Sequence, residues 1–219
     1  MMWGVIPAAG RGSRVVDDHV NGCKELIVIN GRTMLQRTID ELRAAEVDGI
    51  VIVTSPNKPA IKTSLEESGE LTRGDIKFVE QAEPNGLVDA ISQAIPICGE
   101  NMLVATPDNL YLRHPCPAYE LLRVHGTSQR CVIGVVPVVS PWGEMLGDTG
   151  RVDSLYNSKN SEHRALSGIL EKRKTKPFPL TVPPRWRCTG RMIVTTEFWW
   201  QTGLDDVEKL GALASQGRL

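Results

Sequence analysis

The sequence predicts a three-layer α/β/α fold, in which helices cover both faces of a largely parallel sheet. Five short apolar runs bounded by turn residues indicate buried strands, at residues 3–8, 50–54, 76–79, 102–106 and 131–136. Segments with helical spacing separate them, and such alternation is typical of a parallel sheet. A chain of 219 residues is long enough for one such domain with a buried core.

Helices are expected between the strands. The first is expected from Thr33, because Gln36 follows three residues later in a capping-box pattern and apolar residues then recur at helical spacing. Further helices are expected at residues 60–68, 87–95 and 204 to about 216. After about residue 113 the pattern weakens, and the polar segment 153–164 is expected to be a mobile loop.

Composition excludes several classes of protein. Lysine and arginine (25) nearly cancel aspartate and glutamate (26), so no bulk positive charge favours nucleic acid or a membrane surface. The five cysteines are scattered without a CxxC pair, which argues against a disulfide framework or zinc site and favours a reducing cytoplasm. We expect no signal peptide, and no run approaches the ~20 apolar residues of a membrane helix.

A glycine-rich loop follows the first predicted strand. Gly10 and Gly12 allow close approach of the backbone to an anion, and successive N–H groups can then cradle phosphate oxygens. Arg14 adds a forked donor, and Lys24 follows ten residues later. A GxG pair alone would more often be a plain turn with solvated cations.

The loop matches neither common nucleotide motif. Val15 occupies the third glycine position of GxGxxG, and no GK[ST] follows as a P-loop requires. The strand at 50–54 also ends without an acidic ribose ligand. An NAD-dependent oxidoreductase is therefore disfavoured.

The loop does resemble the signature of nucleotide-diphospho-sugar pyrophosphorylases, a family that includes glucose-1-phosphate thymidylyl- and uridylyltransferases. Gly10, Gly12, Ser13, Arg14 and Lys24 stand in the family's register, although Cys23 replaces the usual proline. The resemblance implies a Rossmann-like nucleotidyltransferase fold with a mixed sheet. It also implies one domain over residues 1–219, with a nucleotide-binding half (1–112) and an acceptor-binding half (113–219).

The nucleotide-binding residues implied by the resemblance are Ala9, Gly10, Gly12, Ser13, Gln81 and Gly86. Gln81 and Gly86 match the family's base-reading segment, where a glutamine and a glycine pair with the edge of uracil or thymine. A carboxamide offers both donor and acceptor, which suits a pyrimidine imide. Leu87 resembles uridylyl and thymidylyl enzymes more than guanylyl or adenylyl ones.

Asp108 ends a predicted buried strand and resembles the aspartate of the family's "LGDN" segment, which implies a Mg²⁺ ligand. The family's second metal-binding aspartate, in a "WxDTG" segment, has no counterpart in this order. Asp148 begins the letters DTG elsewhere, and Asp205 and Asp206 are candidates by elimination only. Metal binding could be less complete, another group could substitute, or the catalytic status could differ.

The acceptor half resembles the family more weakly. Gly143 matches a "YG" segment near the sugar site, and Glu171 and Lys172 resemble an "EKP" pair that takes sugar hydroxyls and the sugar phosphate. Arg173 replaces the proline, and the preceding segment is longer than in relatives. A solvated charge run is the alternative. Residues 188–194 resemble the next strand of the sugar half.

The resemblance implies a cytoplasmic nucleotidyltransferase that joins a nucleoside triphosphate, UTP or dTTP, to a sugar 1-phosphate and releases pyrophosphate. Arg14, Lys24 and Asp108 would be its catalytic residues, and Mg²⁺ its cofactor. Two alternatives stay open: transfer to another acceptor such as phosphocholine or a cyclitol phosphate, and a nucleotide-binding regulatory homologue without turnover. The sequence does not identify the acceptor or the oligomeric state.

Overall fold

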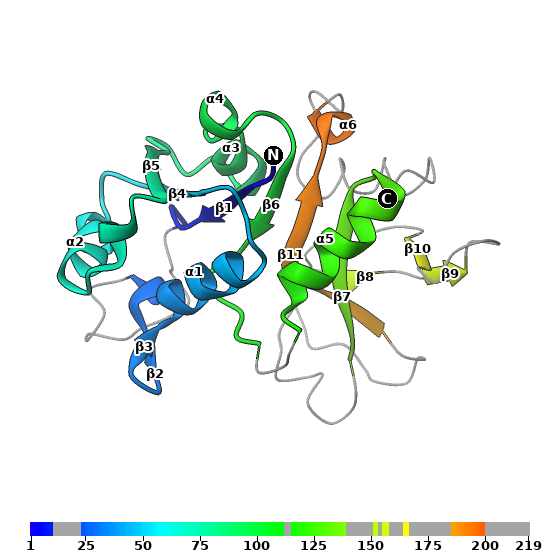
Figure 1. The fold of residues 1–219 in the computed structure, drawn as a ribbon, viewed down its shortest axis with the longest axis horizontal. Coiled ribbons are helices and arrows are strands. Elements are labelled where there is room, and N and C mark those ends of the chain that lie inside the picture. The colour runs from blue at the N-terminus through cyan, green and yellow to red at the C-terminus, as the bar shows by residue number, and fades with distance from the viewer. Residues whose placement is uncertain are drawn as a thin grey trace.

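The protein was studied as a computed structural model that describes residues 1–10, 23–111, 115–138, 151–152, 155–157, 164–166 and 185–199. A seven-stranded mixed sheet forms its centre (Figure 1). Its strands are β1 (Trp3–Pro7), β4 (Ile50–Thr54), β5 (Ile76–Glu80), β6 (Met102–Ala105), β7 (Val132–Val138), β8 (Arg151–Val152) and β11 (Arg185–Val194). The order is β5-β4-β1-β6-β11-β7, and β8 pairs with β11.

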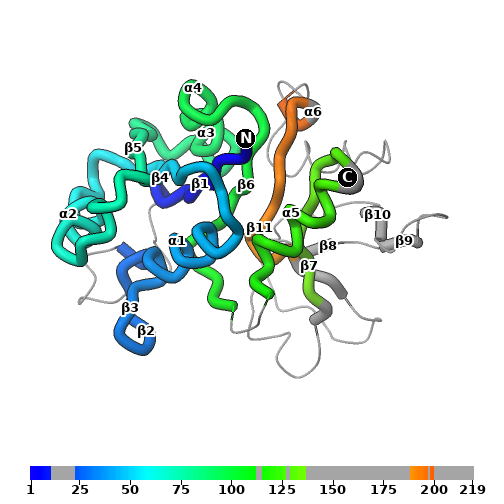
Figure 2. Tube along the Cα trace, viewed as in Figure 1, coloured from blue at the N-terminus to red at the C-terminus, as the bar shows by residue number. Residues whose placement is uncertain are grey.

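The first four strands in this order are parallel, and β11 runs antiparallel to both β6 and β7. Although β11 comes late in the chain, it lies between β6 and β7 (Figure 2). The strand therefore joins the N-terminal part of the sheet to the C-terminal part. The predicted mixed sheet is confirmed.

Helices cover both faces. The helices are α1 (Met34–Ala44), α2 (Pro59–Glu67), α3 (Leu87–Ser92), α4 (Ile95–Cys98), α5 (Pro117–Ser128) and α6 (Thr196–Trp199), with 3₁₀ turns η2 (Lys24–Leu26) and η3 (Glu70–Arg73). Side chains alternate between the faces of a strand. Ile6 accordingly packs in one core cluster with α1, α2 and α5, and Val5 packs in another with α3 and α6. The predicted three-layer fold is confirmed.

Local sequence signals explain how these elements begin and end. Thr33 and Gln36 form the predicted capping box: Gln36 N donates to Thr33 Oγ1 (3.1 Å), and Thr33 N donates to Gln36 Oε1 (2.9 Å). Before it, β2 (Val28–Ile29) and β3 (Arg32–Thr33) form a hairpin. Its turn residues Asn30 and Gly31 both have positive φ (47° and 76°), as Asn-Gly hairpin turns favour.

Two predicted elements differ from the structure. The helix expected at 87–95 is divided into α3 and α4, because Pro96 lacks an N–H and its ring clashes with the preceding turn. The segment expected to be a loop at 153–164 contains β9 (Leu155–Asn157), which pairs antiparallel with β10 (Arg164–Leu166), and its residues 153–154 and 158–163 lie outside the described residues. Helix α5 was not predicted. The helix expected at 204–216 lies outside the described residues.

Arg43 connects the end of α1 to the segment between α2 and β5. Its guanidinium donates to both carboxylate oxygens of Asp75 (2.8 and 2.9 Å) and to Glu70, which also accepts from Arg32 (2.8 Å). Burial raises the pKa of Glu70, but the hydrogen bonds and charges of Arg43 and Arg32 outweigh it and lower that pKa overall. The hydrogen bond from Arg43 lowers the pKa of Asp75.

Within the described part of the chain, no helix is both long enough and apolar enough to cross a membrane.

Arg43→Met should destabilise the fold at pH 7 by about 3 kcal/mol, because it leaves two partly buried carboxylates without this partner. Lowered carboxyl pKa values stabilise the wild type above the ordinary values of these groups, and the benefit is lost as pH falls through the lowered values. The difference between wild type and variant should therefore shrink from about pH 5 to about pH 2. Urea unfolding followed by circular dichroism measures it.

Lys62→Met is the control, since within the described residues Lys62 forms just an exposed pair with Glu66 at 3.9 Å. It should change the free energy of unfolding by less than about 0.5 kcal/mol at any pH. An Arg43→Met deficit that stays constant across the acid range would contradict the ion-pair account.

Candidate functional site

The carboxyl ends of β1, β4, β5 and β6 meet at one edge of the sheet, because these strands are parallel. The chain moves outward from β1 through β4 to β5 and then returns to place β6 on the other side of β1. Such a reversal of strand order leaves a crevice at the strand ends, where α/β proteins bind ligands. Gly10 follows β1 at this crevice, and Asp108 follows β6.

Lys24 and Asp108 contact each other at this edge. The Lys24 Nζ lies 2.8 Å from Asp108 Oδ2, and the two side chains are 27% and 43% exposed. Asn109 donates from Nδ2 to Asp108 Oδ1 (2.9 Å). Burial raises the pKa of Asp108, but the hydrogen bond and charge of Lys24 outweigh it and lower that pKa overall. Asp108 is therefore an anion at neutral pH, and it faces a cation before any ligand binds.

The Asp108 carboxylate fits a Mg²⁺ ion that takes most of its ligands from elsewhere. Among the described residues no three His, Cys, Asp or Glu side chains gather into a metal cluster. Mg²⁺ in phosphate-transfer sites is typically held by one or two carboxylates plus water and substrate phosphates. A single, partly exposed carboxylate at the carboxyl ends of the strands suits that arrangement.

A buried ion pair holds in place the segment that carries Lys24. Lys58 Nζ donates to Glu25 Oε2 (2.8 Å) and to the Ala8 carbonyl oxygen (3.0 Å), and the side chains are 5% and 1% exposed. The pair thereby fixes η2, which carries Lys24, against the end of β1. Sequence reasoning missed this pair, because a lysine before a helix-initiating proline gives no local signal.

Cys23, at the position of the family's proline, is buried in the core. Burial raises the pKa of its thiol more than the nearby Lys58 lowers it. A neutral thiol therefore takes the apolar place of the proline without disturbing Lys24.

The structure brings Gln81 and Gly86 together. Gln81 follows β5, is 3% exposed, and donates from Nε2 to the Gly86 carbonyl oxygen (3.2 Å) and to Asp89 Oδ2 (2.6 Å). Gly86 has φ 102°, a backbone conformation that favours glycine, and α3 begins at the next residue. Nearby, Thr54 accepts from Gln81 N through its carbonyl (2.8 Å), while its buried hydroxyl has no hydrogen-bond partner in the described structure.

Of the other predicted site residues, Ala9 is buried and Gly10 is exposed immediately after β1. The remaining ones lie outside the described residues: Gly12, Ser13, Arg14, Gly143, Asp148, Glu171, Lys172, Asp205 and Asp206.

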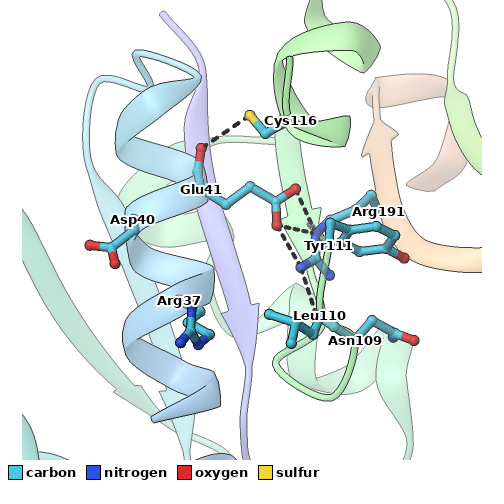
Figure 3. A pocket seen from close by; sticks show the side chains of 8 residues that line it. All are labelled: Arg37, Asp40, Glu41, Asn109, Leu110, Tyr111, Cys116 and Arg191. Carbon is cyan, nitrogen blue, oxygen red and sulfur yellow. Dashed lines mark hydrogen bonds and ion pairs between the residues drawn. The ribbon is translucent and has the colours of Figure 1, made fainter. Parts of the chain in front are cut away.

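A pocket of about 210 Å³ opens beside the loop that carries Asp108 (Figure 3). It is lined by Arg37, Asp40, Glu41, Asn109, Leu110, Tyr111, Cys116 and Arg191. Arg191 and Glu41 form an ion pair across it at 2.7 Å, with side chains 1% and 9% exposed. Neither residue was expected to belong to the site, since 150 residues separate them in sequence.

The chain is similar to UTP–glucose-1-phosphate uridylyltransferases. It is 27% identical to that of Bacillus subtilis over 216 residues, covering 89% of this chain and 71% of the relative. It is 25% identical to that of Salmonella typhimurium over 225 residues, covering 89% and 73%.

Solved structures show the same fold. A crystal structure of apo UDP-glucose pyrophosphorylase has a TM-score of 0.78 at 19% identity, covering 100% of this chain and 89% of the other. The UTP-bound UGPase of Acinetobacter baumannii has a TM-score of 0.73 at 22% identity, covering 99% and 82%.

The sequence profile of the MobA-like NTP transferase domain matches residues 4–156. The match begins in β1, includes the glycine loop, Lys24, Gln81 and Asp108, and extends into β9. The relatives and the solved structures agree with it and confirm the resemblance in the sequence to sugar-nucleotide pyrophosphorylases. The chain therefore belongs to the MobA-like NTP transferase family.

Proposed function

We propose that the protein transfers a nucleotidyl group from UTP or dTTP to a sugar 1-phosphate and releases pyrophosphate. The observation that carries the proposal is the contact between Lys24 and Asp108 (2.8 Å) at the crevice between β1 and β6. It sets one cation and one anion at the edge of the sheet where β1 and β6 end. The named activity of the relatives, UTP–glucose-1-phosphate uridylyltransferase, supports the choice of substrates.

The reaction requires a phosphate oxygen of the acceptor to attack the α-phosphorus of the triphosphate. A new P–O bond forms, the bond from the α-phosphorus to the bridging oxygen breaks, and pyrophosphate leaves with that electron pair. Both reactants are anions, so the protein acts mainly by neutralising and aligning them. The N–H groups of the glycine loop (Ala9, Gly10, Gly12 and Ser13) would hold phosphate oxygens, and Arg14 would face the charge on the transferring phosphorus.

Lys24 has two partners in this proposal. Without ligand its ammonium pairs with Asp108, and with triphosphate bound it contacts phosphate oxygens. Asp108 would then ligate Mg²⁺, which supplies positive charge to the departing pyrophosphate. The buried Lys58–Glu25 pair keeps η2 in place, so only the Lys24 side chain needs to move.

The base site is proposed at Gln81 and Gly86. The donor end of the Gln81 carboxamide is held by Gly86 and Asp89, so its oxygen can accept from the imide N–H of uracil or thymine. Purines present no matching imide edge and need more room.

The first experiment measures pyrophosphate release from UTP, dTTP, CTP, GTP and ATP, each with sugar 1-phosphates, phosphocholine and a cyclitol phosphate. UTP and dTTP with a sugar 1-phosphate should be fastest. The two should differ by no more than ~10–200-fold, the usual worth of one methyl group. Faster turnover with GTP or ATP would show the base site to be misassigned. Faster turnover with phosphocholine or the cyclitol phosphate would change the acceptor class, and triphosphate binding without turnover would indicate a regulatory homologue.

Asp108→Asn should lower turnover on the order of 10²–10³-fold and abolish its dependence on Mg²⁺ concentration, because an amide is a poor ligand for Mg²⁺ and removes charge from the site. Steady-state rates across a Mg²⁺ titration measure both effects. The control is Glu66→Gln, since Glu66 lies on α2 and forms an exposed pair with Lys62 (3.9 Å) in the described part of the chain. If both variants respond to Mg²⁺ as the wild type does, Asp108 is not the metal ligand.

Lys172→Ala tests the acceptor half. If Lys172 binds the acceptor phosphate, its loss should raise the KM of the acceptor about 10-fold or more while the KM of the triphosphate stays near normal. Glu171→Ala should weaken polyhydroxylated acceptors and leave phosphocholine unaffected. Equal effects of Lys172→Ala on both substrates would place this lysine outside the acceptor site.

A further inference from the structure

We propose that the buried Arg191–Glu41 pair is a positioning unit for the loop at residues 106–109, and that it sets the geometry of Asp108 for metal and triphosphate. The inference rests on the proposed function for the role of Asp108. It adds to that function two residues which neither the glycine loop nor the acidic motif indicates.

Arg191 holds both ends of the loop. Its Nη1 donates to the Thr106 carbonyl oxygen (2.7 Å), and its Nη2 donates to the Asn109 carbonyl oxygen (3.3 Å). These carbonyls flank Pro107 and Asp108. Thr106 N in turn donates to the Gly190 carbonyl oxygen (2.9 Å), one residue before the arginine. The path of the loop is therefore tied at both ends to β11, which comes from the other half of the chain.

Glu41 fixes the guanidinium in this position. The carboxylate accepts from Arg191 Nε at 3.0 Å and from Nη2 at 2.7 Å, a forked arrangement that favours one orientation of the arginine (Figure 3). Glu41 Oε1 also accepts from Ala118 N (3.2 Å) at the start of α5. The ring of Tyr111 lies 4.9 Å from the guanidinium, and its hydroxyl donates to the Thr189 carbonyl. The pair thus cross-links α1, α5, β11 and the loop.

The packing at Gly190 shows how little space the loop has. Gly190 has φ +72°, and a Cβ there would lie 2.1 Å from Thr106 Oγ1 and 2.7 Å from Asn109 Nδ2. The same Asn109 amide donates to Asp108 Oδ1. A shift of β11 would therefore be transmitted directly to the group that orients the Asp108 carboxylate.

The Arg191–Glu41 pair has a role beyond stability, because the arginine also donates hydrogen bonds to the backbone of the loop that carries Asp108. A buried ion pair by itself is weak evidence of stabilisation, since its desolvation cost can exceed its attraction. Groups that orient a metal ligand, in contrast, typically change metal affinity or activity by 10–100-fold when removed. Arg191 donates two hydrogen bonds to the loop backbone. A change in metal affinity therefore distinguishes a positioning role from a purely stabilising one.

The test compares variants by the affinity of Mn²⁺, measured by electron paramagnetic resonance in the presence of a non-hydrolysable UTP analogue. Arg191→Lys keeps the charge but lacks the fork that reaches both carbonyls, and should raise the Mn²⁺ Kd about 10-fold. Arg191→Met and Glu41→Gln should raise it about 10–100-fold. Thermal unfolding of each variant shows the temperature range in which it is folded.

Arg43→Met is the matched control. Arg43 lies on α1, also forms a forked, largely buried ion pair, and does not contact the loop. It should lower Tm as Arg191→Met does while leaving the Mn²⁺ Kd unchanged. If Arg191→Met does not fold, the Arg191→Lys and Glu41→Gln measurements decide the question.

Asp108→Asn separates the two hypotheses. It should lose tight Mn²⁺ binding. If it does so while Arg191→Lys and Glu41→Gln bind Mn²⁺ as the wild type does, or while Arg43→Met weakens binding equally, the positioning role is overturned and the proposed function stands. If Asp108→Asn binds Mn²⁺ as the wild type does, Asp108 is not the metal ligand, and the positioning role fails together with the role given to Asp108 in the proposed function.

Discussion

The parallel pairing of β1 with β4 on one side and β6 on the other is the constraint on which the site depends. It makes β1 a central strand with apolar neighbours on both faces, where Val5 and Ile6 are fully buried in opposite core clusters. Because the strands are parallel, every following turn lies at the same edge. Gly10, Gln81 and Asp108 therefore lie at this edge, although they are far apart in the sequence.

Three ion pairs then convert this edge into a defined site, and they differ in exposure. Lys58–Glu25 (5% and 1%) and Arg191–Glu41 (1% and 9%) are closed off from solvent, whereas Lys24–Asp108 (27% and 43%) is accessible. Buried pairs that also hydrogen-bond to the backbone hold one geometry, since separating them exposes a bare charge to the interior. The two buried pairs therefore hold the surrounding elements in place, and the accessible Lys24–Asp108 pair is the one that a ligand can separate.

The sequence allowed prediction of what is encoded locally. Strand positions, the capping box at Thr33 and the layer order follow from periodicity and turn chemistry, and all are confirmed. Lys24 and Asp108 were assigned to one site only because a known family supplied the pattern, and their direct contact was not predicted. Arg191 with Glu41 could not be predicted, since such a pair depends on how β11 inserts between β6 and β7. Strands β9 and β10 were missed for a related reason: backbone pairing of two short segments does not require an apolar pattern.

The accessible pair also defines which form of the nucleotide fits under the proposed function. A free triphosphate that took Lys24 away from Asp108 would leave the carboxylate facing phosphate oxygens, and two unit charges of like sign at about 4 Å repel by about 4 kcal/mol near a protein surface. A triphosphate that arrives with Mg²⁺ gives Asp108 a cation in exchange for the one it loses. The ligand-free contact of 2.8 Å therefore favours the metal–triphosphate complex over the free anion, because only the complex leaves both charges paired.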